Sequence, residues 1–295
     1  MKDQPINRRA LLLLNPHARL GQKVRLQTIH YLQKLGFKLI EELVSDPKNL
    51  SQIIRQYEGQ TELVIIGSGD GTISAAIEGL LSTQIPLGIL PLGTANNLAR
   101  TLEIPRSLSQ ACNIIAKGKT RRIDLGCLNG KYFLNVAGLG LSTVINQQVT
   151  QEFKRRWGVL AYIATALKVA SQVSPFEVEI CWNKQSIKTK TRQVTICNGR
   201  YYGSGLIVAE DAAIDDQRLD LCSLEIQNWW ETLTLLPALM RGNYGNCPGI
   251  RTLQGTKFEL YTPQPCPIDI DGETIAQTPA HFRLIPQALS VFAPF

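Results

Sequence analysis

The sequence predicts a two-domain protein of the α/β + β class, with a doubly wound α/β domain first and a β-rich antiparallel domain after it. Its 295 residues are about twice the length of an ordinary domain. The first part alternates continuous apolar runs with helical periodicity, a pattern typical of a parallel sheet covered on both faces. The later part alternates apolar and polar residues, as half-buried strands do. We therefore expect an α/β domain over 1–125, joined by a C-terminal return at about 285–295, and a β-rich domain over 126–284.

Three apolar runs in the first domain predict buried parallel strands, a further strand is expected after the first helix, and helices are expected between the strands. The first helix closes at Gly36, and Asp46-Pro47 supplies an N-cap and a first-turn proline for the second. A third helix follows Thr72, where apolar residues recur at helical spacing. The expected strands are Ala10–Leu14, a segment around Phe37–Val44, Leu63–Ile66 and Leu87–Leu90.

A hairpin opens the second domain, because the turn dipeptide Asn129-Gly130 separates two runs that favour strands, Leu125–Leu128 and Tyr132–Val136. Further segments alternate in the manner of antiparallel strands up to about residue 284. Helices are expected after Gly140, from Trp157 and near 228–241.

Composition and charge exclude several classes of protein. No run of 18 or more apolar residues exists, which argues against a membrane span, and the polar start argues against a signal peptide. Seven cysteines without a Cys-x-x-Cys pair indicate reduced thiols in the cytoplasm, and the three histidines lack zinc spacing. Residues 1–150 carry 17 Lys and Arg against 10 Asp and Glu, whereas 151–295 carry 14 of each. The basic first half indicates an anionic partner: a nucleotide, a nucleic acid or an acidic membrane surface.

A glycine-rich segment, Gly67–Thr72, lies where a predicted strand ends and a helix begins. Ligands bind at this edge of open α/β sheets, and backbone N–H groups there suit phosphate. The segment matches neither a P-loop nor Gly-x-Gly-x-x-Gly, since Thr72 stands at the third glycine position. Asp70 would repel phosphate unless a cation lay between them, so bound nucleotide implies magnesium.

A second such segment, Pro91–Arg100, follows the next strand. Thr94 is expected as the N-cap of a helix, with Asn96 and Asn97 in its first turn. Two neighbouring loops rich in glycine and hydroxyl residues at one sheet edge predict a cleft that takes a ligand.

These motifs, together with two that follow, resemble the diacylglycerol kinase catalytic-domain family of lipid kinases, which includes bacterial diacylglycerol kinases and sphingosine kinases. The resemblance covers essentially the whole chain, and its first 140 residues are the most specific. It implies an ATP-dependent kinase with a nucleotide-binding α/β domain of the kind shared with NAD kinases, a β-rich lipid-substrate domain, and an active site in the interdomain cleft. The motifs are Gly69–Thr72, Gly93–Arg100, Asp124–Gly126 and Asn135–Gly140.

The resemblance also implies roles for individual residues. An acidic network around catalytic magnesium would include Asp70, position 97 and Asp124, while the position of Arg100 suits it to offset phosphate charge. The chain departs from the family at Asn97, where many members have Asp, and at Ser68 and Ala75, where Gly and Glu are frequent. The residues expected to hold ATP are Asn15, Ser45, Gly67, Ser68, Gly69, Asp70, Gly71, Thr72, Ser74 and Thr94, with Asn97 and Arg100 beside them.

A second, structural magnesium site is implied near Asp216. Bacterial members bind this ion with one carboxylate between two backbone carbonyls, which here correspond to Asp216 and to the carbonyls of Ala213 and Arg218. Gln217 stands where glycine is usual. An acidic hairpin turn without metal is the alternative interpretation.

Three carboxylates follow one another at alternate positions of Asp269-Ile270-Asp271-Gly272-Glu273. On a strand this spacing places Asp269, Asp271 and Glu273 on one face. A solvated turn at Asp-Gly is the alternative. Family members have Asp-Gly-Glu here, which implies the catalytic general base for the lipid hydroxyl. Asp271 and Glu273 both remain candidates, with Glu273 favoured.

The expected partners are ATP, Mg2+ and a lipid such as diacylglycerol, met at the membrane surface by a cytoplasmic, peripherally attached enzyme. No nucleic acid is expected, and a homodimer is left open. The basic and tryptophan-containing segments Lys154–Trp157 and Trp229-Trp230 suit interfacial contact. NAD kinase is an alternative, although Gly88–Asn97 has the lipid-kinase form. A catalytically weak lipid- or nucleotide-binding protein is another, because of Ser68, Ala75 and Asn97.

Overall fold

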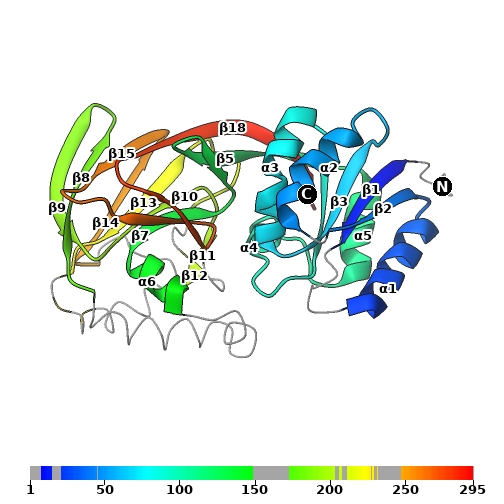
Figure 1. The fold of residues 1–295 in the computed structure, drawn as a ribbon, viewed down its shortest axis with the longest axis horizontal. Helices are drawn as coiled ribbons and strands as arrows, with labels where there is room; N and C mark the ends of the chain where they lie inside the picture. Colours follow the sequence, from blue (N-terminus) through cyan, green and yellow to red (C-terminus); the bar gives the residue numbers. More distant parts are fainter. Residues whose placement is uncertain are drawn as a thin grey trace. The chain divides into compact units, whose positions relative to one another are not determined.

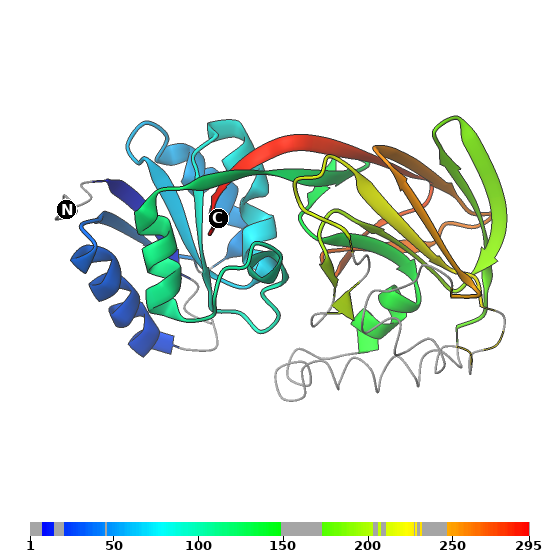
Figure 2. The same cartoon turned by 180° about the vertical axis from the view of Figure 1, so that it is seen from behind.

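The computed structural model describes residues 8–14, 21–44, 46–148, 173–202, 206–207, 211–226, 228, 231 and 247–294. It divides into two compact units, Met1–Ile123 with Gln287–Phe295, and Asp124–Pro286 (Figures 1 and 2). Strands β5 (Thr120–Leu128) and β18 (Ala280–Phe292) each contribute residues to both units. No helix among the described residues is long and apolar enough to cross a membrane.

The first unit is a parallel sheet between helices. Its strands lie in the order β2-β1-β3-β4, and the end of β18 joins β4 through a parallel pair, Val291 with Leu87. Helix α1 packs beside α5, and α2 beside α3, on the two sides of the sheet (Figure 1). The bounds are β1 Arg9–Leu14, α1 Gly21–Lys34, β2 Lys38–Leu43, a 3-10 turn Pro47–Asn49, α2 Leu50–Gln56, β3 Leu63–Ser68, α3 Asp70–Thr83, β4 Leu87–Pro91, α4 Asn97–Thr101 and α5 Leu108–Lys117.

The continuous apolar runs form these strands because both faces of the sheet are covered. All residues of β3 and β4 are buried, and so is β1 beyond Arg9. A parallel sheet covered on both faces has no solvated side that would require polar alternation. The four strands expected from the sequence are confirmed as β1 to β4, as is the α/β class of this part, although β2 at the end of the strand order is only partly buried.

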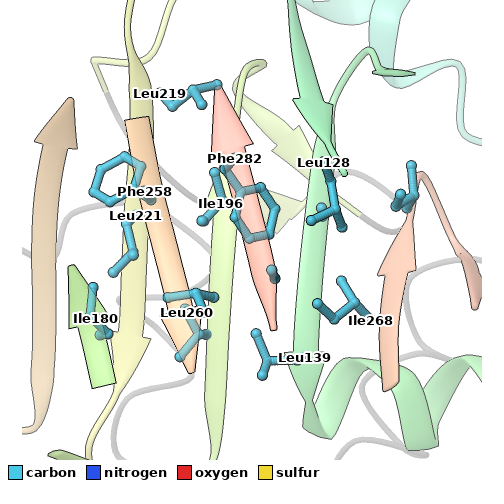
Figure 3. Packing of buried hydrophobic residues seen from close by; sticks show 14 of the residues in the cluster. Leu128, Leu139, Ile180, Ile196, Leu219, Leu221, Phe258, Leu260, Ile268 and Phe282 are labelled. Carbon is cyan, nitrogen blue, oxygen red and sulfur yellow. The ribbon is translucent and has the colours of Figure 1, made fainter. Parts of the chain in front are cut away.

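The second unit consists of antiparallel sheets. One has the order β14-β13-β10-β7-β16-β17; the other contains β5, β6, β8, β9, β15 and β18. Their inward side chains form one core, in which Phe282 meets Phe133 edge to face at 6.4 Å (Figure 3). The remaining bounds are β6 Lys131–Phe133, β7 Val136–Gly140, α6 Leu141–Gln148, β8 Phe176–Trp182, β9 Gln185–Thr191, β10 Gln193–Cys197, β11 Tyr201–Tyr202, β12 Leu206–Ile207, β13 Leu219–Leu224, β14 Ile250–Gly255, β15 Lys257–Tyr261, β16 Pro267–Ile270 and β17 Glu273–Gln277.

The hairpin at Asn129-Gly130 is confirmed. Leu128 pairs with Lys131, and both turn residues have positive φ (46° and 86°), the conformation that Asn-Gly adopts at low cost. The helix expected after Gly140 is α6. The helix expected from Trp157, the segments Lys154–Trp157 and Trp229-Trp230, and most of 228–241 lie outside the described residues.

Candidate functional site

The two glycine-rich segments of the first unit are in direct backbone contact. A Cβ atom on Gly93 would lie 2.4 Å from the Cα of Gly69, and one on Gly69 would lie 3.3 Å from the Cα of Gly93. Because two backbones meet here, neither glycine can carry a side chain without displacing its neighbour. The loop after β3 and the loop after β4 therefore form one structure at the carboxyl edge of the sheet.

Asp70 holds these two segments together through its side chain. Its Oδ2 accepts the main-chain N–H of Asn97 at 2.9 Å, and its Oδ1 accepts that of Leu98 at 3.0 Å. These are first-turn N–H groups of α4, which have no partner inside the helix. Asp70 is also the first residue of α3, where its negative charge suits the helix dipole.

The prediction that Thr94 caps α4 is wrong. The helix begins at Asn97, and its N-cap is Asn96 in a left-handed conformation (φ 51°, ψ 49°). The Asn96 amide accepts from the N–H of Gly93 at 2.9 Å and donates to the carbonyls of Gly93 and Pro91 at 2.8 and 3.3 Å. Asparagine tolerates this conformation and closes the loop on itself, whereas Thr94 is exposed and accepts from Arg106 through its carbonyl.

The other residues expected at the nucleotide lie on both sides of this junction. Gly67 and Ser68 end β3, and the Ser68 hydroxyl contacts that of Thr72 at 2.6 Å. Gly71, Thr72 and Ser74 belong to α3, while Asn97 and Arg100 belong to α4. Asn15 and Ser45 lie outside the described residues.

Asp124 lies in the second unit, beside the loop expected to hold structural magnesium. Its side chain is buried, and its Oδ2 accepts the N–H of Gln217 at 2.7 Å. Its own N–H donates to the carbonyl of Ile214 at 2.7 Å. Two residues that the sequence suggested for different magnesium ions, Asp124 and Asp216, are thus brought to one loop. Sequence reasoning missed this contact because 92 positions separate them along the chain.

The loop around Asp216 is closed by hydrogen bonds to its carboxylate. Oδ2 accepts the N–H of Ala213 at 3.1 Å, and Oδ1 accepts that of Arg218 at 3.2 Å. The Arg218 guanidinium lies 3.1 Å from Asp216 and 2.7 Å from Asp211. Gln217 has a positive φ of 60°, which explains why glycine is usual at this position.

Burial raises the pKa of two carboxylates in this loop. Burial raises the pKa of Asp216 above its ordinary value, the contacts with Ala213 and Arg218 oppose this, and the Asp124 charge adds to the increase. Burial likewise raises the pKa of Asp220. Carboxylate and carbonyl oxygens are the donors that magnesium and calcium prefer. Among the described residues no three acidic, His or Cys side chains converge as a metal cluster, so carbonyls would have to complete the coordination.

The prediction that Asp269, Asp271 and Glu273 share one strand face is wrong. Ile270 pairs with Glu273, so Asp271 and Gly272 form a two-residue turn between β16 and β17, with φ values of 47° and 96°. Such tight turns need positive φ at both positions, and Asp-Gly provides it. Asp269 is buried and accepts the hydroxyl of Thr274 at 2.5 Å. The turn therefore separates the three carboxylates.

Asp271 binds backbone, whereas Glu273 is exposed. The Asp271 carboxylate accepts the N–H groups of Leu134, Asn135 and Val136 at 2.9, 3.0 and 3.1 Å. Its own N–H returns a hydrogen bond to the carbonyl of Val136 at 2.9 Å. Glu273 is the solvent-facing first residue of β17. Of the two candidate bases, Asp271 thus uses its carboxylate to hold the segment between β6 and β7 by hydrogen bonds.

Asn198 is a buried polar residue that the sequence interpretation overlooked. It follows β10, and its amide donates to the carbonyls of Asp124 and Leu134 at 3.0 and 2.8 Å. The available signal was an Asn-Gly pair directly after an apolar strand, which by itself indicates only a turn.

Comparison with known proteins matches this architecture in both units. The family model "diacylglycerol kinase catalytic domain" matches residues 9–128, and "YegS C-terminal NAD kinase beta sandwich-like domain" matches 135–293. An uncharacterized protein of Synechocystis sp. is 30% identical over 275 residues, covering 88% of this chain; the chain spans 63% of that relative's length. A diacylglycerol kinase of Bacillus subtilis is 29% identical over 236 residues, covering 79% of this chain and 78% of the relative.

The fold is likewise found in a solved structure. The crystal structure of a candidate diacylglycerol kinase from Bacillus anthracis superposes with a TM-score of 0.83 at 23% identity, covering 100% of this chain and 98% of that one. The YegS C-terminal model alone covers more than half of the chain, and the diacylglycerol kinase catalytic-domain model covers most of the first unit. These two domain models together account for both units. The chain therefore belongs to the diacylglycerol kinase catalytic-domain family.

Proposed function

We propose that this protein is an ATP-dependent lipid kinase that transfers the γ-phosphate to a hydroxyl of a lipid such as diacylglycerol. The observation that carries the proposal is the junction of the two glycine-rich loops, fixed by Asp70 at the carboxyl edge of a parallel sheet. Backbone N–H groups at such an edge bind phosphate in α/β proteins. Several named relatives are diacylglycerol kinases, which favours a lipid as acceptor.

The nucleotide would lie on the backbone of these loops. Gly67–Thr72 and Ser74 would bind phosphate through main-chain and hydroxyl donors, together with Thr94 and, where the chain continues, Asn15 and Ser45. Arg100, near the end of the short helix α4, offers positive charge. Asn97 retains a neutral oxygen where many family members have a carboxylate, so we expect a weaker metal contact at this position.

Magnesium would supply charge neutralisation of the phosphates. The donors proposed for the catalytic ion are Asp70 and Asp124, as the family resemblance implies, and those for a structural ion are Asp216 with the carbonyls of Ala213 and Arg218. The proximity of the buried Asp124 carboxylate to the Asp216 loop supports the structural site, because carboxylate and carbonyl oxygens are the donors that magnesium prefers.

Glu273 is the proposed general base. The lipid hydroxyl oxygen forms a bond to the γ-phosphorus, the bond between that phosphorus and the β–γ bridging oxygen breaks, and ADP leaves. The hydroxyl proton passes to the Glu273 carboxylate. Asp271 is proposed to position the base rather than to take the proton, since its oxygens already accept three N–H groups.

The acceptor can be identified by offering several hydroxyl compounds at once. Wild-type protein, γ-labelled ATP and Mg2+ are incubated with mixed micelles of diacylglycerol, phosphatidylglycerol, a sphingoid base or an isoprenoid alcohol, with NAD as a water-soluble acceptor. We expect label in one organic-extractable product, and loss of that label in Glu273→Gln. Label in NADP instead would overturn the lipid assignment and favour the alternative hypothesis of an NAD kinase, whose β-sandwich the model of the second unit is named after.

A further inference from the structure

Asn198 connects the backbone of Asp124 to the segment that follows β6. Its side-chain Nδ2 donates to the carbonyl oxygens of Asp124 and Leu134, at 3.0 and 2.8 Å. Its main-chain N–H donates to the carbonyl of Asn135 at 2.9 Å, and the N–H of Gly199 donates to the same oxygen at 3.1 Å. One buried residue thereby fixes the backbone on which Asp124 sits and the segment that follows β6.

The same segment is held from its other side by Asp271. The N–H groups of Leu134, Asn135 and Val136 donate to the Asp271 carboxylate. Glu273 is two residues further along, at the start of β17. Hydrogen bonds therefore run without interruption from the backbone of Asp124 through Asn198 and residues 134–136 to the turn before Glu273, entirely within the second unit.

The buried Asn198 side chain has one polar atom that is not hydrogen-bonded. Its two donor contacts fix its orientation, because a flipped amide would face carbonyl oxygens with another oxygen. In that orientation its Oδ1 is buried and finds no hydrogen-bond partner in the described part of the chain. Leucine has a similar branched shape and would remove this oxygen, but it would leave the carbonyls of Asp124 and Leu134 without their donor. Buried polar atoms without partners are rare, and such departures from the packing rules are expected at functional sites.

We propose that Asn198 is a positioning residue that fixes Asp124 relative to the turn carrying the base Glu273. This inference rests on the proposed function, which assigns Asp124 to magnesium and Glu273 to the acceptor hydroxyl. Loss of the amide would let the carboxylates of Asp124 and Glu273 move relative to one another, although both side chains would still be present. A misplacement of about 1 Å can lower an enzymatic rate by about 100-fold.

The test compares Asn198→Leu and Asn198→Ala with Ser223→Ala in the full-length protein. Ser223 is buried in β13 of the same unit, where its hydroxyl donates to Thr191 at 3.0 Å, apart from the Asn198 network. We expect either Asn198 variant to lower kcat for lipid phosphorylation at least tenfold and to raise the magnesium concentration for half-maximal rate at least threefold. The KM for lipid should change by less than threefold. Ser223→Ala should leave these quantities within twofold.

Amide hydrogen exchange tests the hydrogen-bond network directly, without an activity assay. Both Asn198 variants should exchange faster in peptides covering 133–137 and 269–273, whereas Ser223→Ala should not change these peptides. If exchange in them matches the wild type, the coupling is refuted. Wild-type kcat and magnesium response in a folded Asn198 variant would refute the catalytic consequence. If the wild type phosphorylates no lipid while exchange changes as expected, the proposed function fails and the network stands.

A double variant separates positioning from general loss of stability. Asp271→Asn weakens the other end of the same network, so Asn198→Ala with Asp271→Asn should reduce kcat little further than the more harmful single change. Reductions that multiply would show two independent effects and would overturn the proposal.

Discussion

Asp271 and Glu273 are two residues apart and have different surroundings. Asp271 accepts three main-chain N–H groups, and Glu273 faces solvent. We expect Glu273→Gln to lower kcat by about 100-fold or more with little change in the free energy of unfolding. Asp271→Asn should reduce that free energy by about 1–3 kcal/mol, because two oxygens that accept N–H groups become one. Urea unfolding alongside kinetics measures both; a full loss of activity in a stable Asp271→Asn protein would reverse the assignment.

Buried thiols make stability depend on alkaline pH. Burial raises the pKa of Cys112 from its ordinary 9.0 to about 12, and the pKa of Cys197 also lies well above its ordinary value because of burial. In the unfolded chain these thiols ionise above pH 9, whereas in the folded protein they stay protonated. For Cys112 the stability is therefore complete below pH 9 and falls between about pH 9 and 12, by up to about 1.4 kcal/mol per pH unit. Cys197 contributes in the same direction.

Chemical unfolding of wild type and Cys112→Ala at pH 8, 9 and 10 isolates this contribution. Other titrating groups affect both proteins equally, so the difference between the two slopes belongs to Cys112. We expect the decline to be shallower in the variant. Parallel declines would mean that the Cys112 thiol ionises equally in both states.

At the scale of elements, Asp70 joins α3 to α4. Removing its carboxylate in Asp70→Ala leaves the N–H groups of Asn97 and Leu98 without this acceptor. We expect a loss of about 1–2 kcal/mol of stability, the usual value of a helix cap, together with loss of ATP binding. Asp46→Ala is the matched control, since Asp46 caps the turn Pro47–Asn49 by accepting from Lys48 at 3.0 Å. Equal effects of the two changes on ATP binding would contradict a special role for Asp70.

Strands were more predictable than the loops between them. Each run such as Leu63–Ile66 is apolar throughout because both faces of its strand are covered, so composition alone identified it. The cap of α4 depends on which residue directly precedes the helix, and the sequence cannot decide this because Thr94 and Asn96 are both common cap types. The segment Asp269–Glu273 has the alternation of charged and other residues that a continuous strand would show. Ile270 nevertheless pairs with Glu273 across a turn, and strand pairing cannot be seen in one segment of sequence.

At the scale of the whole molecule, the chain returns at its end to the unit in which it began. Phe292 is buried there, and the Arg8 guanidinium lies between the rings of Phe292 and Phe37, at 5.3 and 5.5 Å. Phe292→Ala should lower the free energy of unfolding by about 3–5 kcal/mol, the usual cost of truncating a buried aromatic residue. Calorimetry measures this; a change below 1 kcal/mol would show that the last strand contributes little to the first unit.

Long-range contacts account for most of what sequence reasoning could not reach in the candidate site. The motifs around Asp70, Asp124 and Glu273 were recognisable individually. That Asp124 binds the Asp216 loop, and that Asn198 reaches both Asp124 and Leu134, follows only from the packing of distant strands. Such contacts have no periodic signal in a single chain.

The most direct test of the account is whether wild-type protein moves labelled γ-phosphate from ATP into diacylglycerol in mixed micelles, measured with magnesium and with excess chelator. We expect label in the organic phase, as the phosphorylated lipid, only when magnesium is present. Label that appears in NADP but in no lipid, or ATP binding without transfer to any acceptor, would contradict the assignment as a lipid kinase.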